Sequence, residues 1–229
     1  MEKKQYDLVV EVLSRLDKVE VLDKLVLVGS WCLLFYKEYF SKVKYIPAIK
    51  TRDIDFLVPL PSRIGVKVNI IGLLKDLGFI KGFYGDEGVM KLEHPELILE
   101  FLVPERGKGS SKPYDLPQLG INAQALRFLD FLTYKKIQVF VEGIKITLPH
   151  PAVFSLHKLI ISARRQDKEK TKKDKEDAKR VLKALIEKGE ADTIKEVFES
   201  VFVGWQKKIL KSLDEIEDKE IISLLENKK

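Results

Sequence analysis

The sequence predicts an α/β (α+β) domain followed by an all-helical lobe. Short apolar runs rich in β-branched residues, separated by turn residues, recur as far as Pro149 and indicate strands. After Pro151 such runs stop, and apolar residues return every three or four positions, which indicates helices. We therefore expect an α/β domain over residues 1–149 and a helical domain over residues 150–229.

The composition is that of an ordinary folded protein. The 229 residues are 45% hydrophobic and 33% charged, which is enough apolar material for one large core or a domain with a smaller lobe. Cys32 is the sole cysteine, so an internal disulfide and a multi-cysteine zinc site are excluded. No targeting segment or uncharged span of about 18 residues is visible. We expect a cytoplasmic protein with no membrane partner.

The first elements alternate between helix and strand. An amphipathic helix is expected over residues 5–20, followed by a strand in KLVLV, a turn at Gly29-Ser30 and a buried helix in WCLLFYKEYF. Further strands are expected at 53–58, 88–92 and 97–103. A helix over 66–78 separates the first two of these, with Gly78 placed as its C-terminal cap.

The remaining elements are one hairpin and a series of helices. The segment IQVFVEGIKITLP predicts a hairpin that turns at Glu142-Gly143. The helical lobe is expected to contain four helices, over residues 153–165, 168–188, 192–203 and 205–225.

Asp53 and Asp55 are the clearest candidates for chemistry. Alternate residues of a strand point to the same side, about 6.6 Å apart along it, so these two carboxylates face one space. Placing two anions together is costly unless cations or hydrogen bonds compensate, and a divalent metal ion would do so. A strand with one polar, solvated face is an equally good explanation of this pair alone.

A third acid, Glu100, stands in a similar apolar strand, LILEFLVP. Three acids on neighbouring strands favour a metal cage over an isolated ion pair. Carboxylate oxygens suit Mg²⁺, which usually keeps positions open for water or phosphate, and such a site suits phosphoryl transfer with one or two metal ions. The turn at Gly29-Ser30 adds the start of a helix, whose free N–H groups bind phosphate, although a Gly-Ser pair is more often a simple turn.

The segments LVLVGSWCLLFY, TRDIDFLV and LILEFLVP, in this order, resemble the nucleotidyltransferase superfamily of the DNA polymerase beta type. In that superfamily a strand ends in Gly-Ser or Gly-Gly at the start of a helix, an Asp-x-Asp lies on the next strand, and a third acid lies on a later strand. Gly29-Ser30, Asp53 with Asp55, and Glu100 match these positions. The resemblance implies a small mixed sheet flanked by helices.

The second half resembles the helical region of small prokaryotic nucleotidyltransferase-fold proteins. The similarity covers LPHPAVFSLHKLIISARRQDKEKTKKDKEDA, and the matching positions are His157, Lys158, Arg164, Arg165, Lys170, Lys173 and Asp174. We expect Lys158 and Arg165 to contact a nucleotide triphosphate, together with Gly29, Ser30 and Arg52. A solvated helix face is the alternative for Lys158 and Arg165, an ion-pair network is the alternative for Lys170 and Asp174, and His157 fits a core histidine best.

The resemblance also implies an activity. Asp53 and Asp55 would hold Mg²⁺ against the triphosphate of an NTP such as ATP, and a second Mg²⁺ would add Glu100; Mn²⁺ could substitute. Glu100 would help to deprotonate a hydroxyl acceptor, with RNA or tRNA, a protein or a small molecule left open. The alternative is a catalytically idle module that binds nucleotide or nucleic acid, and it rests on Glu100 and Trp31, where the superfamily usually has other residues.

The net charge of +6 is concentrated in the helical lobe. Residues 164–180 carry nine basic and five acidic side chains, hence +4, which leaves +2 for the remainder. We therefore interpret the basic excess as a local surface opposite the acidic site, across a cleft that would bind metal and triphosphate, rather than as a general affinity for polyanions.

Overall fold

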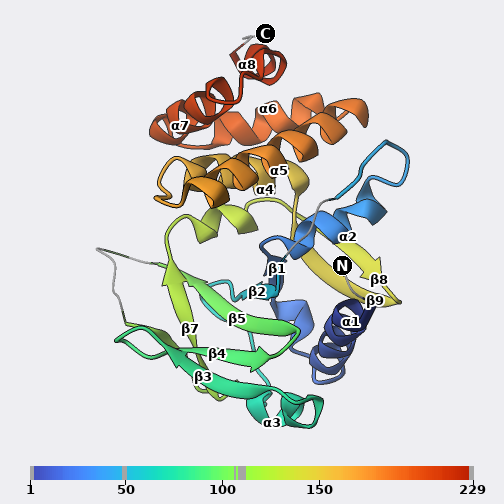
Figure 1. Cartoon of the computed structure of the whole chain (residues 1–229), viewed down its shortest axis with the longest axis vertical. Helices are drawn as coiled ribbons and strands as arrows, with labels where there is room; N and C mark the ends of the chain where they lie inside the picture. The colour runs from blue at the N-terminus through green and yellow to red at the C-terminus, as the bar shows by residue number, and fades with distance from the viewer. Residues whose placement is uncertain (1–2, 48–50, 106, 108–111, 227–229) are drawn as a thin grey trace. The chain divides into compact units, whose positions relative to one another are not determined.

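The chain divides into a unit built around β-sheets and a unit built from helices. The computed structural model describes residues 3–47, 51–105, 107 and 112–226, and Figure 1 shows the course of the chain. The first unit contains Met1–Phe35 and Ile49–Pro149, and the second contains Tyr36–Ala48 and His150–Lys229. The segment Tyr36–Ala48, which the sequence analysis placed in the α/β domain, thus groups with the helices.

The first unit contains three α-helical segments, three 3₁₀ turns and all the described strands. Its elements are α1 (Lys3–Lys18), η1 (Leu22–Lys24), β1 (Val26–Val28), the start of α2 (Trp31–Tyr39), β2 (Asp53–Leu57), α3 (Ile70–Leu74), η2 (Lys75–Leu77), β3 (Ile80–Tyr84), β4 (Val89–His94), β5 (Leu97–Pro104), β6 (Tyr114–Leu116), β7 (Ile121–Leu126), η3 (Leu129–Thr133), β8 (Lys136–Val141) and β9 (Ile144–Pro149). The mixed α/β fold class is therefore confirmed.

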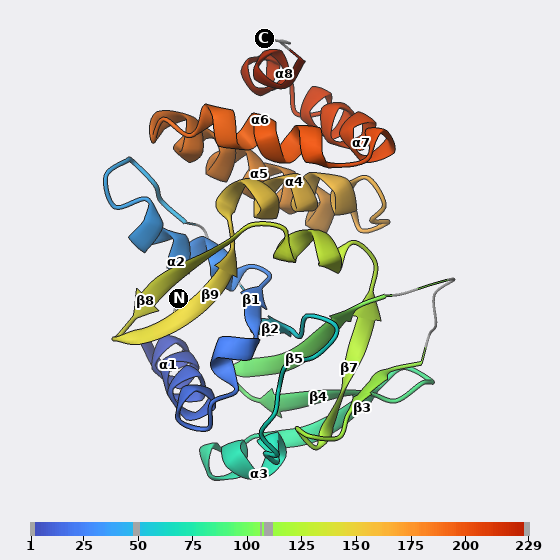
Figure 2. The same cartoon turned by 180° about the vertical axis from the view of Figure 1, so that it is seen from behind.

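The main sheet is mixed, as expected. Its strands run in the order β1-β2-β5-β4-β3, with β7 also paired to β5 and β6 paired to β7. The pairs β2–β5 and β5–β7 are parallel, whereas β1–β2, β4–β5, β3–β4 and β6–β7 are antiparallel. The hairpin of β8 and β9 forms a separate two-stranded sheet, visible as the curved ribbon beside α1 in Figure 2.

The main sheet buries one face and leaves the other polar. On β2 the side chains of Ile54 and Phe56 are fully buried, while Asp53 is exposed and Asp55 is half-buried. Phe56 stacks on Phe101 of β5, with ring centroids 5.8 Å apart. Because side chains alternate along a strand, the apolar residues form the core and the acids of β2 share the opposite face.

Most of the elements expected in this unit are present. The strands around 88–92 and 97–103 correspond to β4 and β5, and the hairpin turns at Glu142 and Gly143, whose φ angles of 48° and 81° fit a tight hairpin turn. The expected helix over 66–78 is shorter. Asn69 caps its start by accepting from the Gly72 N–H at 3.1 Å, and Gly78 ends η2 in the left-handed region, at φ 91°.

Three strands were missed. In β3 most residues are exposed, in keeping with an edge strand, and β6 is only three residues long, so neither carries a strong apolar pattern. The strand β7 has the sequence INAQAL, in which small and polar residues reduce the strand propensity. Their pairing partners, rather than their own composition, determine these strands.

The helical unit is built around α4. Its elements are the end of α2, α4 (Pro151–Ser162), α5 (Lys168–Glu187), α6 (Ala191–Ser200), α7 (Val203–Asp214) and α8 (Lys219–Glu226). Nearly every residue of α4 is buried, as expected for a helix surrounded by others, and Figure 1 shows α5, α6 and α7 gathered around it. None of the helices in the described part of the chain is long and apolar enough to cross a membrane.

The last predicted helix is two helices. The pattern over 205–225 suggested one, but α7 ends at Asp214 and α8 begins at Lys219. Glu217 adopts a positive φ of 53°, and the carboxylate of Asp218 accepts from the N–H of Ile221 at 3.3 Å, as an N-cap does. The polar run between the helices thus breaks a pattern whose apolar spacing continues.

A polar cluster holds the Tyr36–Ala48 segment within the helical unit. The Tyr39 hydroxyl lies 2.7 Å from Glu190 Oε2 and 3.0 Å from His150 Nε2. His150 Nδ1 accepts from the Ala152 N–H at the start of α4. Burial, followed by the hydrogen bond to Glu190, raises the pKa of Tyr39, so the phenol stays protonated and donates.

Candidate active site

The three predicted acids lie on one face of the main sheet. Asp53 and Asp55 alternate on β2, and the parallel register of β2 and β5 places Asp55 directly beside Glu100. Since paired residues of neighbouring strands project to the same side, the three side chains share the polar face. The structure brings these residues together as neighbours on adjacent strands.

The turn at Gly29 lies against Asp55. Val28 of β1 pairs with Asp55, and the chain then turns at Gly29, whose φ is 75°. A Cβ atom at Gly29 would lie 2.1 Å from Asp55 Oδ2, closer than any non-bonded contact allows. The backbone conformation therefore favours glycine here, and any other residue would also displace the Asp55 carboxylate.

Helix α2 begins directly after this turn. The N–H groups of Cys32 and Leu33 donate to the carbonyl oxygens of Gly29 and Ser30, at 3.3 and 3.1 Å. The bulk of Trp31 does not project into solvent, because its side chain is fully buried and its ring lies 5.9 Å from that of Phe35. Within the described residues its Nε1 has no hydrogen-bond partner.

Lys91 of β4 is paired with Glu100, and the sequence analysis did not single it out. The two residues face each other across the antiparallel β4–β5 pair, and Lys91 Nζ donates to Glu100 Oε1 at 2.6 Å. Burial alone would lower the pKa of Lys91, but the hydrogen bond to Glu100 and the charges of Glu100 and Asp53 together raise it. The pairing of β4 with β5 places Lys91 on the same face as Glu100, and the sequence VMKLEH alone gives no signal of that pairing.

The donor set suits one divalent ion better than a cage of three acids. Asp53 and Asp55 supply hard oxygen donors on one face, which Mg²⁺ prefers, and a side chain at position 29 would displace the Asp55 carboxylate. Among the described residues, however, no group of three His, Cys, Asp or Glu side chains is arranged to hold a metal ion. Glu100 is instead bonded to Lys91.

Arg52 precedes the first acid and is exposed. Its guanidinium donates to the carbonyl oxygen of His94 at 2.9 Å, and its own carbonyl oxygen accepts from the Ile98 N–H at 2.8 Å. The side chain thus lies along the ends of β4 and β5. Its contact with a nucleotide stays a prediction.

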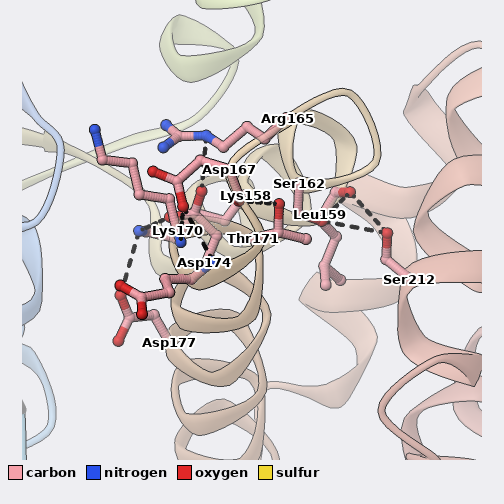
Figure 3. Close-up of polar contacts among 11 residues, drawn as sticks. Lys158, Leu159, Ser162, Arg165, Asp167, Lys170, Thr171, Asp174, Asp177 and Ser212 are labelled. Atoms are coloured by element: carbon pink, nitrogen blue, oxygen red, sulfur yellow. Dashed lines mark hydrogen bonds and ion pairs between the residues drawn. The ribbon is translucent and has the colours of Figure 1, made fainter.

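Lys158 lies in a buried ion-pair cluster of the helical unit. Figure 3 shows the contacts that join it to two carboxylates of α5. Lys158 Nζ is 2.6 Å from Asp174 Oδ1 and 3.3 Å from Asp177 Oδ2, and the three side chains are at most 7% exposed. Burial raises the pKa of Asp177, whereas the charge of Lys158 opposes that rise. The ammonium is therefore already neutralised inside the unit.

Two arginines complete this cluster at its edge. Arg165 Nε lies 3.1 Å from Asp174 Oδ2, and Arg180 lies 3.3 Å from Asp177 Oδ1. An ion-pair network does form in this region, but the partners of Asp174 are Lys158 and Arg165 rather than the expected Lys170. The solvated helix face considered for Lys158 is wrong, because that side chain is buried. The Arg165 side chain is 39% exposed, whereas that of Lys158 is buried. Arg165 is therefore the better candidate of these two residues for a phosphate contact.

His157 is a buried histidine, as favoured by its place beside the apolar face. Its side chain lies in α4, and within the described structure no partner bonds to its Nε2. Burial, followed by the charges of Lys158 and Arg165, lowers the pKa of His157 to about 3. The imidazole is neutral at physiological pH.

Comparison with known families agrees with this geometry. The sequence pattern of a family described as Nucleotidyltransferase matches residues 7–202. The chain belongs to this nucleotidyltransferase family. The match includes the Gly29-Ser30 turn, the acids of β2 and β5, and helices α4 to α6.

Solved structures of nucleotidyltransferases share the fold. One is ANT(2″)-Ia in complex with adenylyl-2″-tobramycin, at 13% identity and a TM-score of 0.51, covering 85% of this chain and 95% of that one. Another is an antigenic nucleotidyltransferase-like protein from Paracoccidioides brasiliensis, at 13% identity and a TM-score of 0.50, covering 96% and 93% of the two chains. No curated protein sequence matches the chain.

Proposed function

We propose that the protein transfers a nucleoside monophosphate from an NTP to a hydroxyl group, with Mg²⁺ as cofactor. The observation that carries the proposal is the placement of Asp53 and Asp55 on one sheet face, with the backbone of Gly29 directly against Asp55. Family membership supports the reaction class. The adenylyl-2″-tobramycin found in complex with ANT(2″)-Ia supports adenylyl transfer as one form of it.

The residues of the candidate site would have separate roles in binding the metal ion and the phosphates. Asp53 and Asp55 would hold Mg²⁺, and the Ser30 hydroxyl, just before α2, would bind a phosphate oxygen. Bound Mg²⁺ supplies positive charge that stabilises the triphosphate in the transition state. The remaining contribution of the protein is to position the two substrates.

Glu100 would act on the acceptor. The acceptor oxygen forms a bond to the α-phosphorus while the bond from that phosphorus to the pyrophosphate oxygen breaks. The hydroxyl proton moves to a Glu100 carboxylate oxygen, and pyrophosphate leaves. Glu100 is only 14% exposed and is held by Lys91, so its orientation is fixed before the acceptor arrives.

The test is transfer of a radioactive α-phosphate. The full chain is incubated with each NTP, with Mg²⁺ or Mn²⁺, and with total RNA, tobramycin or no added acceptor. We expect labelled product, and a fall on the order of 10²-fold or more in Asp53→Asn and in Asp55→Asn. Asp214→Asn, an exposed aspartate at the end of α7, is the matched control and should retain activity.

A nucleotide-binding module without catalysis is the second candidate. The pairing of Glu100 with Lys91 favours it, because that pairing occupies an acid which the transfer reaction would use. Nucleotide binding that depends on Mg²⁺ without label transfer to any acceptor would support the module. Absence of both binding and transfer would contradict both candidates.

A further inference from the structure

The ammonium group of Lys91 is bonded to Glu100, the acid to which the family resemblance assigns a second metal ion. On the polar sheet face, Lys91 Nζ is 2.6 Å from Glu100 Oε1, and the two side chains are only 23% and 14% exposed. Asp53 also contributes to the electrostatic environment of Lys91. One built-in positive charge therefore lies among the acids from which the metal site would be formed.

The neighbouring strand fixes the position of this ammonium group. Lys91 Nζ lies 4.8 Å from the ring centroid of Tyr84 on β3, a cation–π contact. Directly opposite Lys91 on β3 is Gly82, where a Cβ atom would collide with Glu93 Oε1 and crowd Tyr84. The Lys91 ammonium group thus contacts both the Tyr84 ring and the Glu100 carboxylate, which hold it in place.

The Lys91–Glu100 pair opposes a second metal ion. Such an ion would have to displace an ammonium group that already donates to Glu100 at 2.6 Å, or bind beside the positive charge of that group. Either is unfavourable, because a divalent ion needs carboxylate oxygens that are available to it.

We propose that Lys91 replaces the second metal ion, so that the site binds one divalent ion at Asp53 and Asp55 while Lys91 neutralises and orients Glu100. This inference rests on the proposed function only for the role of Glu100 in catalysis. What it predicts is the number of bound cations, which can be measured without turnover. Lys91 is a positioning residue, because it acts through Glu100.

Mn²⁺ titration followed by electron paramagnetic resonance counts the ions bound to the full chain. We expect one ion in the wild type, lost in Asp53→Asn. In Lys91→Met we expect a second ion, bound at least about tenfold more tightly than any second ion in the wild type, which corresponds to about 1.4 kcal/mol. Adding Glu100→Gln to Lys91→Met should remove that second ion. Lys91→Arg keeps the positive charge and should bind one ion.

An ordinary structural ion pair predicts a different result. In that case Lys91→Met would lose stability without gaining a metal ion, and this outcome would overturn the inference, as would two ions of similar affinity in the wild type. Circular dichroism checks the fold, and Lys91→Gln replaces the Met variant if that variant does not fold. If the wild type binds one Mn²⁺ ion and Lys91→Met gains a second that requires Glu100, but no label transfer is seen with any acceptor, the inference stands and the proposed function fails. A wild type that binds no Mn²⁺ would overturn the inference.

Discussion

At the scale of single residues, Gly29 determines whether the acidic face can function. The residue has a positive φ, and its missing side chain leaves space that Asp55 Oδ2 enters. An Ala at this position would be strained by the backbone conformation and would also meet the carboxylate. The same atom contact therefore affects both the folding and the chemistry of the site.

We expect Gly29→Ala to lower the free energy of unfolding by about 1–2 kcal/mol from the backbone alone, and more once Asp55 is displaced. Moving Asp55 by about 1 Å should lower transfer activity on the order of 10²-fold. Urea unfolding and the α-phosphate assay measure the two effects. Gly65→Ala is the matched control, because nothing lies within 4 Å of a Cβ atom there. Equal behaviour of the two variants would contradict the role assigned to Gly29.

The residues of the site were predictable to the extent that they follow local patterns. Asp53, Asp55 and Glu100 stand out because acids are rare in apolar strands, and Gly29 stands out as a turn residue after a strand. Lys91 was not predicted, because its importance depends on which strand lies beside β5. That neighbour is set by the pairing of β4 with β5, and a single strand's sequence does not carry this information.

At the scale of elements, a buried cluster joins α4 to α5. Lys158 extends from α4 to Asp174 and Asp177 of α5, and little of any of the three side chains is exposed. Removing one partner from such a cluster strongly lowers the free energy of unfolding, because the other charges then stay buried and unpaired. The packing of the two helices thus depends on a charge that the sequence analysis assigned to nucleotide binding.

Lys158→Met should therefore lower the free energy of unfolding by about 3–5 kcal/mol. Lys172→Met is the matched control. Lys172 lies on α5, the helix that carries Asp174 and Asp177, but its side chain is exposed and its Nζ lies 3.9 Å from Glu176 Oε1. Its removal should change the free energy of unfolding by no more than about 0.5 kcal/mol. Chemical denaturation of both variants checks this. A loss below about 1 kcal/mol in Lys158→Met would mean that Arg165 and Arg180 suffice for the two aspartates.

The elements themselves were predicted best where apolar periodicity is strong. Helix α1 was expected at 5–20, and its buried residues are Val9, Val12, Leu13 and Leu16. Short or exposed strands were missed because pairing with neighbours, which is not local information, stabilises them. The break between α7 and α8 was missed because a side-chain cap at Asp218 overrides a continuing apolar pattern.

At the scale of the whole molecule, a histidine that is buried in its neutral form makes stability depend on pH. His157 has its pKa lowered to about 3 by burial, with Lys158 and Arg165 adding to the effect. In the unfolded chain the imidazole takes up a proton near pH 6.5, whereas in the folded protein it stays neutral. The unfolded state therefore binds more protons over this range, and folding stability decreases as the pH falls.

We expect the free energy of unfolding to be unaffected by His157 above pH 6.5 and to fall below it, with a slope that approaches about 1.4 kcal/mol per pH unit. His157→Phe, which does not titrate, should show a smaller loss between pH 6.5 and 4.5. Urea unfolding of both proteins at several pH values checks this. Parallel curves for the two proteins would show that His157 is protonated in the folded state.

The membership of Tyr36–Ala48 in the helical unit has a consequence for synthesis. Tyr39 leaves the ribosome early, but its partner His150 follows 111 residues later. At synthesis rates of about 5–20 residues per second, that interval lasts roughly 5 to 20 s. During it, the sequence of most of the sheet unit emerges while Tyr36 and Tyr39 still lack the ring of Phe154 and the imidazole of His150. The order of translation thus delays completion of the helical core until the sheet unit has been made.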